Sequence, residues 1–255
     1  MRSASGIAHQ FRDQCMQRSP VGHLPESASL HAPPAKAARK RGDLDLRITE
    51  IFHSLQGESR SVGWPTVFVR LTGCPLRCVW CDTEYSFHGG EWRDIGAILD
   101  EVARYGARQV CVTGGEPLAQ KRCLVLLQRL CDAGYEVSLE TSGALDVAPV
   151  DPRVIKVVDL KAPGSGEVAR NLWSNLDAVT TRDQIKIVLA DRADYDWAVS
   201  ALREHQLPAR CEVLFSPVHG KLAPRELADW ILADALDVRM QLQLHKLLWG
   251  EQPGH

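Results

Sequence analysis

The chain has 255 residues, of which 45% are hydrophobic and 24% are charged, and its formal net charge is −2. These values are those of an ordinary globular protein, and they give no electrostatic basis for binding nucleic acid or a membrane surface. No apolar run approaches the roughly 18 residues that a membrane span needs. The eight cysteines are unevenly placed, with three of them within residues 74–81. A secreted disulfide framework is shorter and more evenly cross-linked, so we expect a reducing, cytoplasmic compartment.

The first 43 residues differ in composition from the rest of the chain. They carry Ser, Ala, Pro and His without a period, and seven basic residues against three acidic ones give them a net charge of +4. The composition predicts a disordered leader or a spurious upstream extension, and the alternatives are a nucleic-acid-binding arm or an organelle transit peptide. We therefore expect one domain at 44–255, preceded by a leader at 1–43.

From residue 44 onward, strand-like runs alternate with helix-like runs. Helical periodicity predicts helices at 94–105, 118–133, 193–205 and 224–235. The repeated strand–helix–strand order predicts an α/β fold with a parallel sheet, and about six such units favour a partial (β/α)6-type, TIM-like barrel with reduced helices. Runs rich in Val, Ile and Leu predict the strands at 47–53, 66–71, 109–113, 136–140, 154–159, 184–189, 212–215 and 241–244.

Small, polar and ionisable residues follow most of these predicted strands. In a parallel sheet the functional residues gather at the carboxyl ends of the strands. The sequence therefore predicts a site at this one rim. The segments that would form it are 72–74, 114–117, 141–143, 161–163, 216–220 and 245–246.

Cys74, Cys78 and Cys81 form a C-x3-C-x2-C pattern directly after the strand predicted at 66–71. Structural zinc normally takes four protein ligands, and no second C-x2-C or paired His lies at zinc-finger spacing. A redox interpretation of Cys78 and Cys81 leaves Cys74 unexplained. Three thiolates can instead hold a [4Fe–4S] cluster by three of its irons, which leaves the fourth iron open to a ligand that is not protein. We favour this last interpretation.

The cysteine spacing resembles the signature of the radical S-adenosylmethionine (SAM) enzymes, in which the open iron chelates the methionine moiety of SAM. In that superfamily an aromatic residue at the place of Trp80 faces the adenine, although a packing role for Trp80 is equally consistent with the sequence. Gly114-Gly115-Glu116-Pro117 follows the next predicted strand. Two glycines allow the backbone to approach a ligand closely, and Glu116 can accept from an ammonium group. This element resembles the one that binds the SAM amino group.

Further motifs narrow the resemblance to one family. The chain resembles the 7-carboxy-7-deazaguanine synthases, radical SAM enzymes of the queuosine (7-deazapurine) pathway, from about residue 46 to residue 250. Its most discriminating elements are S-L-Q-G-E and C-D-T. Ser59 departs from the pattern, because the family usually has Gly there. The matching segments are 50–59, 68–70, 82–83, 113–118, 140–143, 159–167 and 243–246.

The resemblance implies a role for each matching residue. Arg70 would pair with a substrate carboxylate, a bidentate task that suits a guanidinium group. Thr83 would give its hydroxyl to a Mg²⁺ ion that also binds substrate oxygens. Substrate contacts are implied for Leu55, Gln56, Gly57, Glu58, Arg70, Thr113, His245 and the C-terminal His255. SAM contacts are implied for Trp80, Cys81, Asp82, Gly115, Glu116, Asp159, Leu160 and Lys161.

The implied reaction is the ring contraction of 6-carboxy-5,6,7,8-tetrahydropterin to 7-carboxy-7-deazaguanine with loss of ammonia. The implied cofactors are a [4Fe–4S] cluster, SAM and Mg²⁺, and the implied partners are the small-molecule pterin substrate, an external one-electron reductant of flavodoxin or ferredoxin type, and a second copy of the chain in a homodimer. A radical SAM activase of a glycyl-radical enzyme is an alternative, but it leaves Gln56-Gly57-Glu58 and Thr83 unexplained. A non-catalytic iron–sulfur or zinc scaffold is a second alternative, and it predicts a fourth cysteine or histidine ligand.

Overall fold

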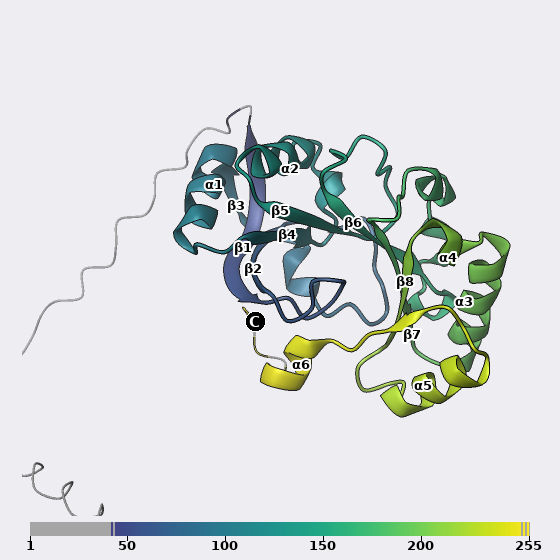
Figure 1. Cartoon of the computed structure of the whole chain (residues 1–255). Helices are drawn as coiled ribbons and strands as arrows, with labels where there is room; N and C mark the ends of the chain where they lie inside the picture. The colour runs from purple at the N-terminus through teal and green to yellow at the C-terminus, as the bar shows by residue number, and fades with distance from the viewer. Residues whose placement is uncertain (1–41, 43, 251, 253, 255) are drawn as a thin grey trace, which may run out of the picture. The chain divides into compact units, whose positions relative to one another are not determined.

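A mixed nine-stranded sheet forms the framework of the chain (Figure 1). The computed structural model describes residues 42, 44–250, 252 and 254. The strands are β1 (Asp45–Leu55), β2 (Pro65–Leu71), β3 (Glu91–Asp94), β4 (Gln109–Gly114), β5 (Glu136–Thr141), β6 (Ile155–Lys161), β7 (Gln184–Leu189), β8 (Glu212–Pro217) and β9 (Arg239–Met240). Their order across the sheet is β3-β1-β2-β4-β5-β6-β7-β8-β9. β1 is antiparallel to β2 and β3, whereas each neighbouring pair from β2 to β9 is parallel.

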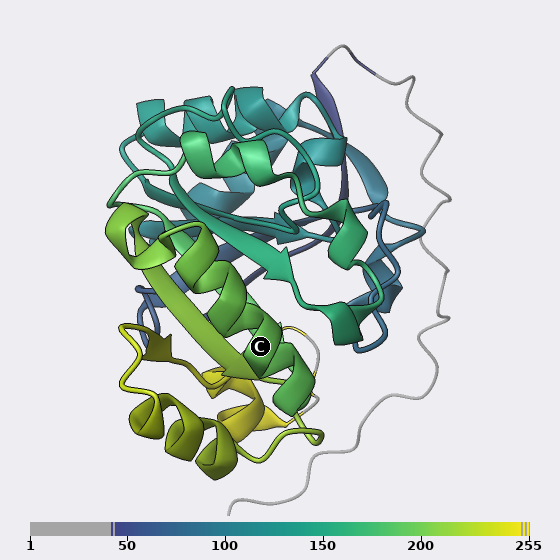
Figure 2. The same cartoon turned by 90° about the vertical axis from the view of Figure 1, so that its right-hand side faces the viewer.

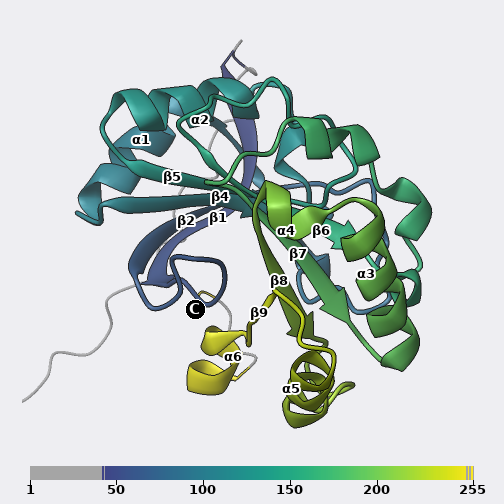
Figure 3. The ribbon, with the colours of Figure 1, turned by 45° about the vertical axis from the view of Figure 1, so that its right-hand side comes forward.

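Helices cover the outer side of this curved sheet. The helices are α1 (Ile95–Arg104), α2 (Cys123–Asp132), α3 (Arg192–Glu204), α4 (Leu207–Arg210), α5 (Pro224–Ala233) and α6 (Leu244–Trp249). Figures 2 and 3 show α2 and α3 along the outer side, whereas α6 lies on the inner side. The Leu244 N–H donates to the Gly57 carbonyl at 3.0 Å, which joins α6 to the loop after β1. The fold is thus a partial barrel of the α/β class, as predicted.

Strand β7 illustrates how the sequence divides the two sides of the sheet. Successive side chains of a strand point to opposite faces. Ile185, Ile187 and Leu189 are fully buried in the core beneath the helices. Lys186 and Val188 alternate with them and line a cavity on the inner side. The core side is therefore apolar and continuous, while the inner side is free to carry charged groups.

Two crossovers contain no α-helix among the described residues. The connection from β6 to β7 forms three short 3-10 turns at Pro163–Ser165, Val168–Arg170 and Trp173–Asp177. Proline and glycine in the first of these disfavour a continuous helix, and Gly166 has a φ of +77°. The expectation of reduced helices is confirmed. No helix in the described part of the chain is long and apolar enough to cross a membrane.

Most predicted elements agree with the structure to within a few residues, but one is wrong and several observed elements were not predicted. The strand predicted at 241–244 is wrong, because the last strand is Arg239–Met240 and Leu244 begins α6. Gln241 makes one further ladder bond, from its N–H to the Phe215 carbonyl at 2.9 Å, and there the pairing ends. β3 and α4 were not predicted, since four residues give too little periodicity. The predicted leader at 1–43 lies outside the described residues apart from Gly42.

Candidate active site

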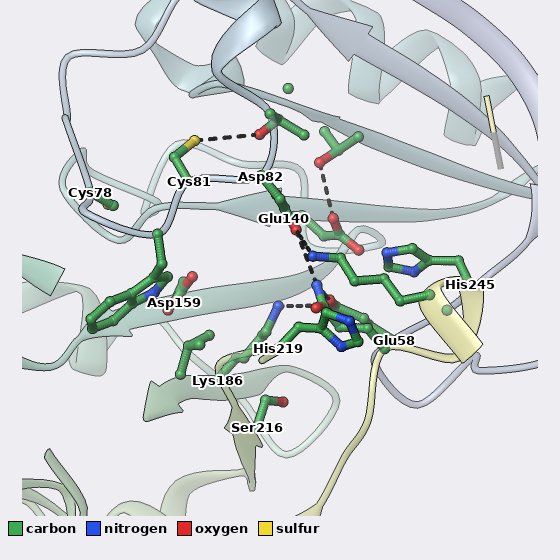
Figure 4. A pocket seen from close by; sticks show the side chains of 18 of the residues that line it. Glu58, Cys78, Cys81, Asp82, Glu140, Asp159, Lys186, Ser216, His219 and His245 are labelled. Atoms are coloured by element: carbon green, nitrogen blue, oxygen red, sulfur yellow. Dashed lines mark hydrogen bonds and ion pairs between the residues drawn. The ribbon is translucent and has the colours of Figure 1, made fainter. Parts of the chain in front are cut away.

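A cavity of about 660 Å³ lies at the carboxyl ends of the parallel strands. Its lining comes from β1, β2, the connections that follow β4 to β8, and α6, so segments far apart in the sequence meet there (Figure 4). This volume is within the range of small-molecule sites in proteins. The predicted site residues that line it are Leu55, Gln56, Gly57, Glu58, Arg70, Cys74, Cys78, Trp80, Cys81, Asp82, Thr83, Thr113, Gly115, Asp159, Lys161 and His245.

Two described residues among the predicted site residues do not line the cavity. The Glu116 carboxylate is fully buried and accepts from Thr141 Oγ1 at 2.9 Å and from the Ser142 N–H at 2.7 Å. Its side chain therefore ties β4 to β5 and does not face a ligand. Leu160 is 1% exposed and points into the core, because it alternates with Asp159 and Lys161 along β6. His255 lies outside the described residues.

The cysteine loop leaves β2 and returns through Thr83. Cys74, Cys78 and Cys81 are free thiols that are partly buried, and all three face the same cavity. Burial raises the pKa of Cys74 and of Cys78, and the nearby Lys161 ammonium opposes this rise. Among the described residues, no group of three or more His, Cys, Asp or Glu side chains is arranged around one metal ion.

The backbone at Gly115 passes directly beside the start of the cysteine loop. A Cβ atom at this position would lie 2.4 Å from the Gly73 carbonyl oxygen and 2.7 Å from Cys74 Cβ. Only glycine allows this approach, so the loop after β4 and the loop after β2 form one continuous wall. The glycine pair thus packs against the cysteine loop and exposes backbone to the cavity.

The cavity lining carries two buried polar atoms that have no hydrogen-bond partner among the described residues. Lys161 Nζ lies 2.7 Å from Asp159 Oδ2, whereas Asp159 Oδ1 has no partner in this part of the chain. Ser216 Oγ, at the end of β8, is likewise buried and unpartnered. Figure 4 shows both side chains at the cavity. A buried polar group without a partner is costly, so these atoms are suited to hydrogen-bond a ligand.

Another part of the cavity lining is formed by β1, β2, β4 and β5. Glu140 accepts from Thr113 Oγ1 at 2.9 Å and from Gln56 Nε2 at 3.2 Å. Arg70 lies beside Thr113 in the β2–β4 register, and its Nε donates to Glu50 Oε1 at 2.7 Å. This bond fixes the guanidinium and leaves the two Nη groups for another partner.

An alternating chain of charges crosses the cavity wall between the loop after β1 and the cysteine loop. Lys186 forms an ion pair with Glu58. Gln243 Nε2 donates to Glu58 Oε1 at 2.8 Å and to Asp82 Oδ2 at 3.2 Å, and Lys246 Nζ lies 3.2 Å from the same Asp82 oxygen. In this row of charges, two carboxylates are therefore held ionised between two ammonium groups.

The pKa values of Glu58 and Lys186 follow from burial and from the neighbouring charges. Burial acts to raise the pKa of Glu58, but the Lys186 ammonium and the Gln243 amide outweigh it, so the pKa is lowered. Burial acts to lower the pKa of Lys186, but the Glu58, Asp159 and Glu140 carboxylates raise it well above its usual value. Lys186 is therefore a permanent cation facing several carboxylates.

His245 packs against the loop that contains Gly57. A Cβ atom on Gly57 would lie 2.2 Å from His245 Nδ1, so glycine is required for this contact. Burial lowers the pKa of His245, although the Glu58 and Asp82 carboxylates oppose the shift. The imidazole is therefore neutral near pH 7 and can either donate or accept a hydrogen bond.

Several lining residues were given no role from the sequence. Ser216 and Lys246 lie on segments that the strand-end rule placed at the rim, and Glu140 is the last residue of the strand predicted at 136–140, but their chemistry was not assigned. Lys186 was missed altogether. A lysine within an otherwise apolar strand was the available signal, since such a charge needs a buried partner.

Comparisons with known proteins agree with this geometry. Residues 68–160 match the model of the radical SAM superfamily. The 7-carboxy-7-deazaguanine synthase of Chlorobaculum tepidum is 48% identical over 208 residues, which cover 80% of this chain and 94% of that protein. The synthase of Koribacter versatilis is 47% identical over 219 residues, covering 80% of this chain and 97% of that protein. The chain belongs to the 7-carboxy-7-deazaguanine synthase family.

A solved structure gives the same result at the level of the fold. The crystal structure of QueE from Escherichia coli superimposes with a TM-score of 0.66 at 26% identity, covering 79% of this chain and 95% of that one. The sequence-based recognition of the synthase family is thus confirmed, and so is the partial barrel.

Membership of the radical SAM superfamily implies a [4Fe–4S] cluster and SAM, and the cavity residues suit both groups. Three free thiols on one loop match the three protein ligands of such a cluster. The glycine backbone at Gly115 and the unpartnered atoms of Asp159 and Ser216 provide a polar cradle beside them. Both groups would therefore be held in the same cavity that Arg70 and Glu140 line.

Proposed function

We propose that this chain converts 6-carboxy-5,6,7,8-tetrahydropterin to 7-carboxy-7-deazaguanine and ammonia. The observation that carries the proposal is that two chemically distinct sets of residues line one cavity. Three cysteines line it, together with Arg70, Glu140 and Gln56. The reaction is balanced by these two products, because removing ammonia from the substrate leaves the deazaguanine carboxylate with no net oxidation.

Cys74, Cys78 and Cys81 would hold the cluster, and Trp80, Asp82, Gly115, Asp159 and Lys161 would hold SAM. When bound, the two groups supply one-electron chemistry that removes a hydrogen atom from carbon. The protein's contribution is to bind both reactants at one place, to orient them and to exclude water. The Cys111 thiol is fully buried in the core, so it is not a further ligand.

Other polar groups of the cavity lining complement a carboxylated pterin. Arg70 offers two Nη groups to the carboxylate, while Glu50 and Tyr85 hold the arginine from behind, with Tyr85 Oη donating to Glu50 Oε1 at 2.8 Å. Glu140 offers acceptor oxygens to the amino-pyrimidine edge, where a pterin presents N–H donors. Gln56, which is bonded to Glu140, can pair with the adjoining ring atoms. Neutral His245 can accept or return a proton near the departing amine.

The proposal includes a Mg²⁺ ion bound by Thr83. Thr83 lines the cavity, and its Oγ1 lies 3.7 Å from Cys81 Sγ. Mg²⁺ prefers oxygen ligands and usually keeps several waters, so one hydroxyl with substrate oxygens and water is a suitable set. An external reductant of flavodoxin or ferredoxin type, a homodimer, and a functional domain at 44–255 are further proposals that rest on the family resemblance.

The test is anaerobic turnover with the full chain. Protein reconstituted with iron and sulfide, then given dithionite, SAM, Mg²⁺ and the carboxylated tetrahydropterin, should release the deazaguanine product and ammonia. Glu140→Gln should keep the absorbance of the cluster and lose turnover, because it removes a charge on the substrate side. Cys78→Ala should lose both. The proposal would be refuted if the protein formed no deazaguanine product and instead activated a glycyl-radical partner.

A further inference from the structure

A short segment after β6 holds the cysteine loop on both sides of Cys78. The Arg77 N–H donates to Glu167 Oε1 at 2.5 Å, and the Val79 N–H donates to the Ser165 carbonyl at 3.0 Å. Arg77 and Val79 immediately precede and follow Cys78. The middle cysteine is thus fixed through its two neighbouring amides by a segment almost ninety residues away in the chain.

This segment, residues 162–167, has a rigid support of its own. Asp194 is 1% exposed, and its two carboxylate oxygens accept from the Gly164 N–H at 2.7 Å and from the Ala190 N–H at 3.0 Å. Ser165 Oγ donates to the Ala162 carbonyl at 2.6 Å and accepts from the Glu167 N–H at 3.1 Å. Glu167 is therefore presented to the cysteine loop from a fixed backbone.

We propose that Glu167 is a positioning residue that lowers the reduction potential of the cluster held by the three cysteines. The proposal rests on the proposed function, because it presupposes the cluster. Hydrogen bonds to the sulfurs and the local net charge set the potential of an iron–sulfur cluster. Backbone amides beside a ligating cysteine are natural donors to those sulfurs. Glu167 takes the Arg77 amide away from this role and adds a negative charge near Cys78.

Both contributions have the same sign. A hydrogen bond to sulfur stabilises the reduced, more negative cluster and raises the potential, so a captured amide leaves the potential lower. A carboxylate nearby disfavours the added electron, which also lowers the potential. The consequence is a stronger one-electron donor that demands a stronger external reductant. The A-P-G-S-G-E motif at 162–167 has no role in binding SAM or substrate among those assigned above. Under this proposal, its function is to hold Glu167 beside the cysteine loop.

The two contributions can be separated by two substitutions at one position. Glu167→Gln removes the charge but keeps an oxygen that can accept from the Arg77 N–H, whereas Glu167→Ala removes both. Glu226→Gln, on the exposed side of α5, is the matched control for loss of one surface carboxylate. The first readout is the midpoint potential of the reconstituted cluster, followed by electron paramagnetic resonance during a reductive titration. The second is hydrogen exchange of the Arg77 amide in the cluster-free protein.

We expect Glu167→Gln to shift the reduction equilibrium toward the reduced cluster by about threefold to tenfold, where tenfold is about 59 mV for a one-electron couple. Glu167→Ala should shift it further and should also lose protection of the Arg77 amide, while Glu226→Gln should match the wild type. If Glu167→Ala binds no cluster, the midpoint potential of Glu167→Gln is the deciding measurement. A potential in Glu167→Gln equal to that of the wild type would overturn the proposal. Unchanged amide exchange in Glu167→Ala would overturn it as well. If the wild type turns over but the variants have the same midpoint potential as the wild type, this proposal alone is refuted. If the reconstituted wild type binds no cluster, this proposal and the proposed function are both refuted.

Discussion

Lys186 of β7 and Lys156 of β6 both form buried ion pairs, and they lie on neighbouring parallel strands. Lys156 Nζ lies 2.9 Å from Asp183 Oδ2, and the two side chains are 6% and 1% exposed. Lys186 pairs with Glu58, and these side chains are 15% and 12% exposed. Burial therefore does not separate the two pairs. The difference is what else surrounds each carboxylate.

At the amino ends of the strands, Asp183 is satisfied by the protein. It accepts from the Lys156 N–H at 2.7 Å and from the Thr180 N–H at 2.8 Å, in addition to the Lys156 ammonium. On the inner side of the sheet, Lys186 faces several carboxylates, and both it and Glu58 line the cavity. A closed pair with every group satisfied fixes the strands, whereas a pair with surplus charge at a cavity is available to a ligand.

Breaking the cavity pair, Lys186 with Glu58, should reduce activity. Lys186→Met keeps the aliphatic stem and removes the cation that faces Glu58 and Glu140. We expect kcat/KM for the pterin to fall by about 100-fold, which is about 2.7 kcal/mol of transition-state stabilisation. Anaerobic turnover measures this, with Lys121→Met as the exposed control. Near wild-type turnover in Lys186→Met would contradict the contrast drawn between the two pairs.

Breaking the closed pair, Lys156 with Asp183, should instead reduce stability. Asp183→Ala leaves the Lys156 ammonium buried without a partner, and we expect the free energy of unfolding to fall by about 3–5 kcal/mol. Denaturant unfolding of the cluster-free protein gives this value, and KM of the remaining folded protein should not change. Asp177→Ala is the matched control, because Asp177 is 83% exposed and pairs with Arg210 at 3.6 Å. An exposed pair of this kind contributes about 0–1 kcal/mol.

The two pairs also mark what the sequence could and could not predict. Cys74, Cys78 and Cys81 are close in sequence, so their spacing alone predicted a shared site, and the strand pattern predicted the rim on which it lies. Glu58 and Lys186 are 128 residues apart, and their pairing depends on how the loop after β1 packs against β7. No local pattern encodes such a contact.

Side-chain direction was the second limit. Glu116 follows two glycines at a strand end, where it was predicted to face SAM, yet its carboxylate turns toward Thr141 and Ser142. The spacing fixed where the loop lies but not which way its side chain points. The segment at 241–244 failed for a related reason, because its apolar alternation has no strand beside it beyond Met240.

The pH dependence of the free energy of unfolding should show whether the charge of Glu58 in the cavity pair stabilises the fold. The pKa of Glu58 in the folded protein is lower than its ordinary value of 4.5. Ionised Glu58 therefore contributes stability fully above pH 4.5, and this contribution is lost as the pH falls through the folded pKa. Each unit of lowering corresponds to about 1.4 kcal/mol.

Glu58→Gln removes this linkage, so the wild type should be the more stable protein at neutral pH, and its advantage should shrink as the pH falls below 4.5. Unfolding of the cluster-free proteins across this range measures the difference. An advantage that stays constant with pH would show that the Glu58 charge does not stabilise the fold.

The smallest expected effect concerns Ser59, which joins the cavity pair to the C-terminal segment. Ser59 is 2% exposed and has a φ of +64°, a left-handed conformation that favours glycine. Its N–H donates to Gln241 Oε1 at 2.7 Å and its carbonyl accepts from Gln241 Nε2 at 3.0 Å, so the backbone is held in this conformation. Both bonds use backbone atoms and do not depend on the side chain at this position.

Ser59→Gly should therefore keep both bonds and relieve strain of about 1–2 kcal/mol. The gain is partly offset by the greater backbone entropy of glycine in the unfolded chain and by loss of the Ser59 Oγ contact with Ser61 Oγ at 3.0 Å. We expect a net stabilisation below about 1 kcal/mol, whereas Ser59→Val should destabilise by about 1–3 kcal/mol, because a β-branched residue is poorly accommodated at positive φ. Denaturant unfolding ranks the three proteins. If valine is tolerated as well as glycine, the backbone at residue 59 is not held by Gln241, and the loop that carries Glu58 to Lys186 is positioned by the ion pair itself.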